Sequence, residues 1–310
     1  MNRFRVAITV RSFDYDGPAM ADLLQSCDIV SANRSGRRLA ETDLPDALRD
    51  SQGVIAGTEP FTRDVFAGAR ALRVISRVGV GTDSIDLAAA RERGIRVFTT
   101  PDAATQAVAE HTLALTLAVL KRIGLYTLSR QGEEVSTPPG ILLSGKTAGI
   151  IGLGRIGHRV ATMLECLGCR IMYHDPAPGR DPRTGWTAAR DLPDLLGQAD
   201  VLTLHAPAQD GGKPLLGAGE LALCRQGAII INTARGTLID EDALVSGLLS
   251  GHIAGAGLDV FAREPYRGPL LAFPQVVTTP HVASHTVESR REMEREAAAN
   301  LLRGLAEVQG

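Results

Sequence analysis

A glycine-rich segment, Gly152-Leu-Gly-Arg-Ile-Gly157, follows a short apolar run and opens a helical pattern. Between a strand and a helix, such glycines permit a tight turn, leave room for a pyrophosphate and let the helix pack closely on the strand. The next strand pattern ends at Asp175, whose carboxylate can accept both hydroxyls of an adenosine ribose. The combination predicts a dinucleotide site, although a tight turn without a ligand is the alternative. Its predicted residues are Gly152, Gly154, Arg155, Ile156, Gly157 and Asp175.

Asp175 also bears on the choice of cofactor. Its negative charge repels the 2′-phosphate that distinguishes NADP from NAD, so we expect NAD. Arg180 and Arg183 follow closely in the sequence and can offset this repulsion, which leaves some use of NADP open.

Residues 140–147, Gly-Ile-Leu-Leu-Ser-Gly-Lys-Thr, match the phosphate-loop pattern of nucleotide triphosphatases. Such a loop needs a strand before it and a helix after it, so that the helix N-terminus faces the phosphates. Here Thr137-Pro-Pro precedes the pattern, and a strand-like run up to Ile151 follows it. We therefore interpret this match as fortuitous.

Several further segments place polar residues next to strand patterns. Together with the glycine-rich segment, and in this order, they resemble the D-isomer-specific 2-hydroxyacid dehydrogenases, in particular phosphoglycerate dehydrogenase-like members. The resemblance extends from about residue 50 to the C-terminus. The segments are Arg77-Val-Gly-Val-Gly-Thr-Asp-Ser-Ile-Asp-Leu87, Asn232-Thr-Ala-Arg-Gly236, Gly257-Leu-Asp-Val-Phe261, Glu264-Pro265 and Thr279-Pro-His281.

The resemblance implies an enzyme that transfers a hydride between NAD and C2 of a 2-hydroxy or 2-keto acid. Arg235 would bind the substrate carboxylate and stabilise charge on the C2 oxygen, as a guanidinium fork can. His281 would donate a proton to that oxygen during reduction and remove one during oxidation. Glu264 would pair with His281 and orient it. His285, four residues further on, is a second candidate to approach the substrate.

The resemblance also implies contacts with the substrate and with the cofactor. The turn Val78-Gly79-Val80-Gly81 should offer backbone N–H groups to the substrate carboxylate, because glycine lets the main chain approach an anion. Arg77 adds positive charge there, whereas Asp83 and Asp86 are expected to cap the following helix. The resemblance places Asp259 at the nicotinamide carboxamide. It implies cofactor contacts at His205, Pro207, Thr233, Ala234 and Asp259.

Short β-branched runs alternate with helical patterns, which is typical of parallel sheets connected by helices. A chain of 310 residues is long for one core, so we expect two Rossmann-like, doubly wound α/β domains with the active-site cleft between them. Residues 1–100 and 281–310 would form a discontinuous substrate-binding domain, and residues 101–280 the NAD-binding domain. Periodicity alone leaves open whether the final helix, 286–305, returns to the first sheet. The expected strands are Arg5–Val10, Gly53–Ala56, Val74–Ser76, Arg96–Phe98, Ala148–Gly152, Arg170–His174, Val201–His205, Ala228–Asn232, Ala254–Leu258 and Val276–Thr279.

The composition argues against several other functions. Thirty-three basic and 35 acidic residues give a net charge of −2, without the basic excess that nucleic-acid binding requires. The first apolar run is too short for a signal peptide, and none reaches the roughly 20 residues of a membrane span. Cys166 and Cys169 have the spacing of a redox or zinc pair, but no second such pair exists, so the four cysteines fit packing in a reducing cytoplasm. We therefore expect no metal, membrane or nucleic-acid partner and a cytoplasmic location.

Three further expectations concern an alternative function, a C-terminal regulatory domain and the oligomeric state. The alternative function is a non-catalytic, NAD(H)-sensing protein on the same scaffold. The chain ends after the final helical pattern, so a C-terminal regulatory domain is not expected. Helix 103–120 is apolar on more faces than one sheet covers, which together with the family predicts a homodimer through the NAD-binding domain.

The substrate itself is not identified by the sequence. It could carry a second anionic group, such as a phosphate or a phosphonate, if basic side chains are placed to bind one. The candidates are Arg11, Arg34, Arg37, Arg38 and Arg63, all of which could equally be solvated surface residues.

Overall fold

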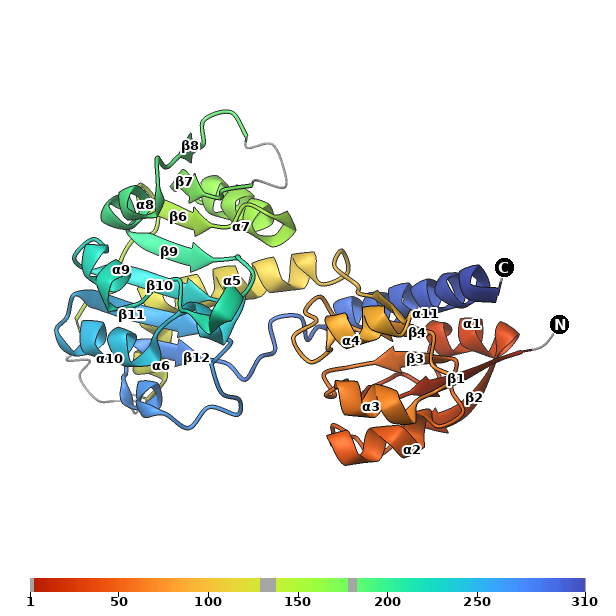
Figure 1. Cartoon of the computed structure of the whole chain (residues 1–310). Helices are drawn as coiled ribbons and strands as arrows, with labels where there is room; N and C mark the ends of the chain where they lie inside the picture. The colour runs from red at the N-terminus through yellow and green to blue at the C-terminus, as the bar shows by residue number, and fades with distance from the viewer. Residues whose placement is uncertain (1–2, 129–137, 178–182, 310) are drawn as a thin grey trace. The chain divides into compact units, whose positions relative to one another are not determined.

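The computed structural model describes residues 3–128, 138–177 and 183–309 (Figure 1). The chain divides into two compact units. Unit 1 consists of Met1–Ala104 and His285–Gly310, and unit 2 consists of Thr105–Ser284. Each division lies four residues beyond the predicted one, at 104 rather than 100 and at 284 rather than 280.

Unit 1 contains a five-stranded, fully parallel sheet with the order β2-β1-β3-β4-β5. Its strands are β1 Phe4–Ile8, β2 Cys27–Ala32, β3 Gly53–Ala56, β4 Val74–Arg77 and β5 Arg96–Phe98. This is the flavodoxin-like strand order of doubly wound folds. The helices are α1 Pro18–Ser26, α2 Leu44–Leu48, α3 Arg63–Gly68, α4 Leu87–Glu92 and α11 Val287–Gln309, with a 3-10 turn at Glu41–Asp43.

The C-terminal helix α11 returns to this sheet. The Ser76 hydroxyl of β4 donates a hydrogen bond of 2.8 Å to the carbonyl of Ala297 in α11. A Cβ added to Gly53 of β3 would lie 2.8 Å from the Leu301 side chain, so the helix packs closely on the strand at this glycine. Residues distant in sequence therefore form one core, and unit 1 is discontinuous.

Unit 2 contains a seven-stranded, fully parallel sheet with the order β12-β11-β10-β9-β6-β7-β8. Counted along the unit, this is the Rossmann order 3-2-1-4-5-6 extended by one strand, and the chain reverses direction across the sheet between β6 and β9. The strands are β6 Thr147–Ile151, β7 Arg170–His174, β8 Thr187–Ala188, β9 Val201–Leu204, β10 Ala228–Asn232, β11 Ile253–Leu258 and β12 Val276–Thr278. The fold class predicted from the sequence is confirmed.

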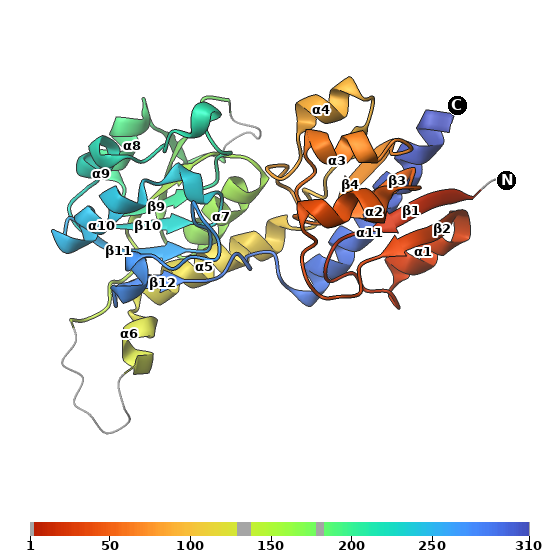
Figure 2. The ribbon, with the colours of Figure 1, turned by 60° about the horizontal axis from the view of Figure 1, so that its bottom comes forward.

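Helices cover both faces of the second sheet. Helices α5 and α7 pack together on one face, and α8, α9 and α10 form a second apolar core on the other. Figure 2 shows α5 running alongside the strands of unit 2. The helices are α5 Thr105–Leu120, α6 Ile123–Leu128, α7 Arg155–Cys166, α8 Leu192–Gln198, α9 Ala218–Leu223 and α10 Glu241–Leu249, with 3-10 turns at Asp210–Gly212, Gly236–Leu238 and Pro269–Ala272.

Two properties of the chain follow from these elements. Within the described residues, no helix is long and apolar enough to cross a membrane. All four cysteines are free thiols; Cys27, Cys169 and Cys224 are buried and Cys166 is exposed.

Candidate active site

The glycine-rich turn between β6 and α7 is shaped by close backbone contacts. Gly152 has a φ of +90°, and a Cβ added there would lie 2.8 Å from the carbonyl group of His205. A Cβ on Gly157 would lie 2.0 Å from the Gly152 carbonyl oxygen, which no side chain tolerates. At Gly154, by contrast, an added Cβ meets nothing within 4 Å. The turn is therefore tightly packed at Gly152 and Gly157 and open at Gly154, where a pyrophosphate needs space.

The start of α7 supplies donors to that space. Arg155 is the first residue of the helix and Ile156 the second, so their N–H groups point out of the helix N-terminus. A helix N-terminus stabilises a phosphate through these donors and through its dipole. The residues present thus fit the diphosphate of a dinucleotide.

Asp175 stands directly after β7, as predicted. Its carboxylate accepts hydrogen bonds from the N–H groups of Leu153, at 2.7 Å, and Ala177, at 2.8 Å. These bonds hold the carboxylate beside the glycine-rich turn, and a carboxylate has further lone pairs for ribose hydroxyls. Of the two nearby arginines, Arg183 donates to Glu165 at 3.1 Å, and Arg180 lies outside the described residues.

His205 and Pro207 follow β9 across the sheet's reversal point from the glycine-rich turn. The His205 ring lies 2.9 Å from the Thr203 hydroxyl, through Nε2. Burial of the ring lowers the pKa of His205 to about 3, so the imidazole is neutral at physiological pH. The His205 ring therefore brings no positive charge to the predicted cofactor site.

Arg235, Glu264 and His281 follow three adjacent strands, β10, β11 and β12. Because the carboxyl ends of parallel strands meet at one edge of a sheet, all three lie at the edge where open α/β sheets bind ligands. This edge brings together the residues that the sequence singled out for chemistry.

The backbone around Arg235 is held by Asn232 at the end of β10. The Asn232 side chain donates to the Arg235 carbonyl at 2.8 Å and accepts from the Ala234 N–H at 3.0 Å. Gly236 follows, and a Cβ there would lie 1.9 Å from the carbonyl carbon of Phe261. The turn that presents Arg235 therefore depends on an amide before it and a glycine after it.

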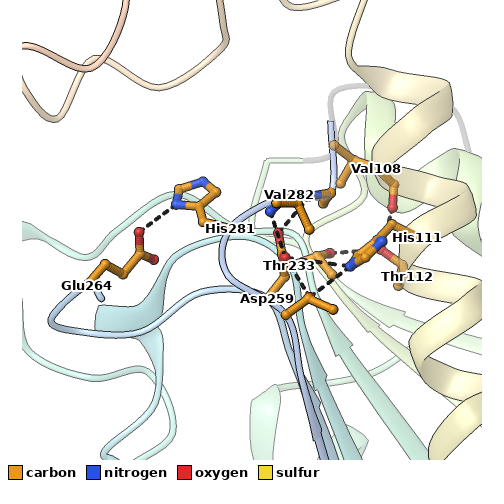
Figure 3. A network of polar contacts seen from close by, with 10 residues as sticks. Val108, His111, Thr112, Thr233, Asp259, Glu264, His281 and Val282 are labelled. Atoms are coloured by element: carbon orange, nitrogen blue, oxygen red, sulfur yellow. Dashed lines mark hydrogen bonds and ion pairs between the residues drawn. The ribbon is translucent and has the colours of Figure 1, made fainter. Parts of the chain in front are cut away.

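His281 and Glu264 form a pair (Figure 3). The Nδ1 atom of His281 lies 2.9 Å from Oε2 of Glu264. The other carboxylate oxygen of Glu264 accepts from the N–H of Phe261 at 3.2 Å. The carboxylate thus holds the ring of the half-exposed His281 through Nδ1, and Nε2 lies at the other end of the ring.

Asp259, at the end of β11, holds the segment that carries His281. Its carboxylate is fully buried and accepts from the Thr279 hydroxyl at 2.6 Å and from the N–H groups of Val282 and Ala283, both at 2.9 Å. Burial alone would raise the pKa of Asp259, but hydrogen bonds from His111, Thr279 and these N–H groups lower it, so the carboxylate is ionised. Its expected contact with the nicotinamide stays a prediction.

In unit 1, the Val78–Gly81 turn follows β4. The N–H of Val78 donates to Ala56 at 2.8 Å, and that of Gly79 donates to Thr100 at 2.8 Å. The N–H groups of Val78 and Gly79 therefore have partners within the protein, and the contact of the turn with a substrate carboxylate stays a prediction. These two N–H groups hold the turn in place. The proposed donors to a substrate carboxylate are therefore the N–H groups of Val80 and Gly81.

The neighbouring charged residues also have structural partners. The Arg77 guanidinium lies against Gly79, where a Cβ would come within 2.2 Å of Nη1. Asp86 caps α4 as predicted, because its carboxylate accepts from the N–H of Ala89 at 2.8 Å. Arg63, a candidate for binding a second anionic group, instead contacts both carboxylate oxygens of Glu92.

Comparison with known proteins agrees with this fold and with the class of a dinucleotide-binding α/β oxidoreductase. The family model "D-isomer specific 2-hydroxyacid dehydrogenase, NAD binding domain" matches residues 113–283, which lie within unit 2. The chain belongs to the D-isomer specific 2-hydroxyacid dehydrogenase family and is an NAD-dependent enzyme.

Three relatives illustrate the range of this family. A glyoxylate reductase of Aeropyrum pernix is 41% identical over 79% of this chain and 77% of its own length. A D-3-phosphoglycerate dehydrogenase of Methanocaldococcus jannaschii is 38% identical over 88% of this chain, which spans only 53% of that relative. The solved NADPH-dependent glyoxylate/hydroxypyruvate reductase of Sinorhizobium meliloti, in complex with NADP and malonate, is 31% identical with a TM-score of 0.84, over 96% of this chain and 92% of that one.

Proposed function

We propose that this protein reduces a 2-keto acid to a D-2-hydroxy acid, and catalyses the reverse oxidation, with His281 as the acid/base, Glu264 as its partner and Arg235 as the substrate anchor. The observation that carries the proposal is the 2.9 Å contact between His281 and Glu264, at the sheet edge that also presents Arg235. When bound, the nicotinamide supplies or accepts the hydride at C2.

Each residue then has a distinct task. The Arg235 guanidinium binds the substrate carboxylate and stabilises the negative charge that grows on the C2 oxygen during reduction. The His281 imidazolium delivers its Nε2 proton to that oxygen, and the neutral ring takes it back during oxidation. Glu264 holds the ring through Nδ1 and stabilises its cationic form.

The finer proposal concerns the substrate. Arg11 follows β1, and Arg34, Arg37 and Arg38 follow β2; all four are exposed at the carboxyl edge of the unit 1 sheet. Arg34 stacks on the Tyr15 ring at 4.1 Å, which holds one guanidinium in place. We propose a substrate with a second anionic group, in keeping with the name of the M. jannaschii relative. Comparing kcat/KM for glyoxylate, hydroxypyruvate and its phosphorylated form tests this: a preference for the unphosphorylated acids contradicts it.

NADH should be used at least about tenfold better than NADPH, because a 2′-phosphate beside the Asp175 carboxylate costs about 1.4 kcal/mol or more. Steady-state kcat/KM for the two cofactors with one keto acid measures this preference. The Asp175→Asn variant keeps the side-chain shape and loses the charge, so its preference should narrow. Equal use of both cofactors by the wild type would show that Asp175 does not select the cofactor.

The protein should form a homodimer through unit 2. The reason given by the sequence needs correction, because α7 and the sheet cover much of the apolar surface of α5 within one subunit. Exposed apolar side chains instead follow that helix in the sequence: Ile123, Tyr126 and Leu142 are 49%, 36% and 67% exposed. Light scattering should give a mass near twice 32.8 kDa, and an Ile123→Glu variant should shift it toward the monomer. A wild-type monomer at micromolar concentration would rule the dimer out.

A further inference from the structure

Helix α5 places two adjacent polar residues against the segments that carry the proposed catalytic groups. His111 contacts the segment leading to His281, and Thr112 contacts the segment leading to Arg235. Figure 3 shows both side chains reaching from the helix toward the strand ends. Neither residue belongs to the predicted site, and both contacts join residues far apart in sequence.

Thr112 is fully buried and meets Thr233, two residues before Arg235. Its hydroxyl donates to the Val108 carbonyl at 2.7 Å, so its oxygen is left to accept the Thr233 hydroxyl at 2.8 Å. Thr233 is itself 7% exposed, so water is a poor substitute for this acceptor. The bond fixes the start of the turn that presents Arg235.

His111 completes a chain of hydrogen bonds into the His281 segment. Thr279 donates its hydroxyl proton to Asp259 at 2.6 Å, so its oxygen must accept from the His111 Nε2–H, 2.9 Å away. The same nitrogen lies 3.5 Å from the Asp259 carboxylate. This chain holds both ends of the Thr279–Ala283 segment, because Asp259 also binds the N–H groups of Val282 and Ala283.

The segment needs such support. His281 has a φ of +56°, a left-handed conformation that is unfavourable for a residue other than glycine. Its N–H donates to the Asp259 carbonyl at 2.8 Å. Relaxation of this backbone would move the imidazole away from Glu264 and from the substrate.

We infer that His111 and Thr112 are positioning residues, which anchor the two catalytic segments to one rigid helix. The inference rests on the proposed roles of His281 and Arg235. Misplacement of a reacting group by about 1 Å costs about a hundredfold in rate, so loss of either anchor should reduce catalysis.

The Thr112 anchor is tested against a matched control on the same helix. Thr116 is also fully buried, and its hydroxyl donates only to the Thr112 carbonyl, at 2.7 Å. Thr112→Val should lower kcat and raise the KM of the keto acid, reducing kcat/KM by about tenfold to a hundredfold. Thr116→Val, which removes a comparable intrahelical bond, and Thr112→Ser, which keeps the hydroxyl, should each stay within about threefold of wild type.

The His111 anchor is tested by removal and rescue. His111→Leu should lower kcat about tenfold or more, and His111→Gln should restore most of it, because an amide N–H can reach the place of Nε2–H. Equal losses in the Leu and Gln variants, or a Thr112→Val variant no worse than Thr116→Val, would overturn the inference. If His281→Asn and Arg235→Lys are also fully active, the proposed function fails instead.

Discussion

Replacing His281 with Asn should lower kcat by about 10²–10⁴-fold while NADH binding stays close to normal. Asparagine keeps much of the shape of the ring and can still donate to Glu264, which lies 2.9 Å from Nδ1. It has no proton that it can transfer to the C2 oxygen, so the loss falls on the chemical step. Steady-state kinetics and fluorescence titration with NADH separate these two effects.

The matched control is His285→Asn, which changes the other histidine of the same region. His285 is exposed and lies outside unit 2, and its variant should remain within about threefold of wild type. Near wild-type turnover by His281→Asn, with a large loss in His285→Asn, would transfer the proton-donor role to His285.

Arg235→Lys should reduce kcat/KM by about a hundredfold or more, through a higher KM and a lower kcat together. Lysine keeps the positive charge but not the planar fork that binds a carboxylate at two points and reaches the C2 oxygen. The bond from Asn232 to the Arg235 carbonyl does not depend on the side chain, whereas the bond that Arg235 Nη1 donates to the Ala234 carbonyl, at 2.8 Å, is lost in the variant.

A control for this variant is Arg225→Lys. Arg225 also carries a guanidinium in unit 2, but it pairs with Asp200 at the opposite end of the sheet, before β10. Its replacement should leave both constants near wild type. An unchanged KM for the keto acid in Arg235→Lys would mean that another group binds the substrate carboxylate.

The sequence predicted most strands because buried parallel strands are continuous apolar runs between turns. All ten expected strands are present, and the described residues contain two others that were missed. Strand β2 follows helix α1 without an intervening turn, and Asp28 and Ser31 interrupt its apolar pattern. Strand β8 has only two residues, both exposed, so it has no hydrophobic signal at all. Edge strands of this kind are defined by pairing with a neighbour, which local sequence does not encode.

The residues of the candidate site likewise divide into those that could be predicted from the sequence and those that could not. The glycine-rich turn could be predicted because its glycines are closely spaced in sequence, and one of them, Gly157, answers a local steric requirement, the contact with the Gly152 carbonyl. His111 and Thr112 could not, because their partners lie 168 and 121 residues further along the chain. On sequence alone they are polar residues in an apolar helix. Their contacts with Thr279 and Thr233 arise only because the fold brings α5 against the ends of β10 and β12.

The central claim, that the protein is a 2-keto acid reductase and not a binding protein that senses NAD(H), is tested most directly by product formation. Purified protein is incubated with NADH and a panel of 2-keto acids, and both NADH consumption and the chirality of the hydroxy acid are measured, with His281→Asn in parallel. The account predicts stoichiometric NADH oxidation and the D-isomer for at least one acid, and a large loss in the variant. Tight NADH binding by the wild type without oxidation by any acid of the panel, or formation of the L-isomer, would contradict it.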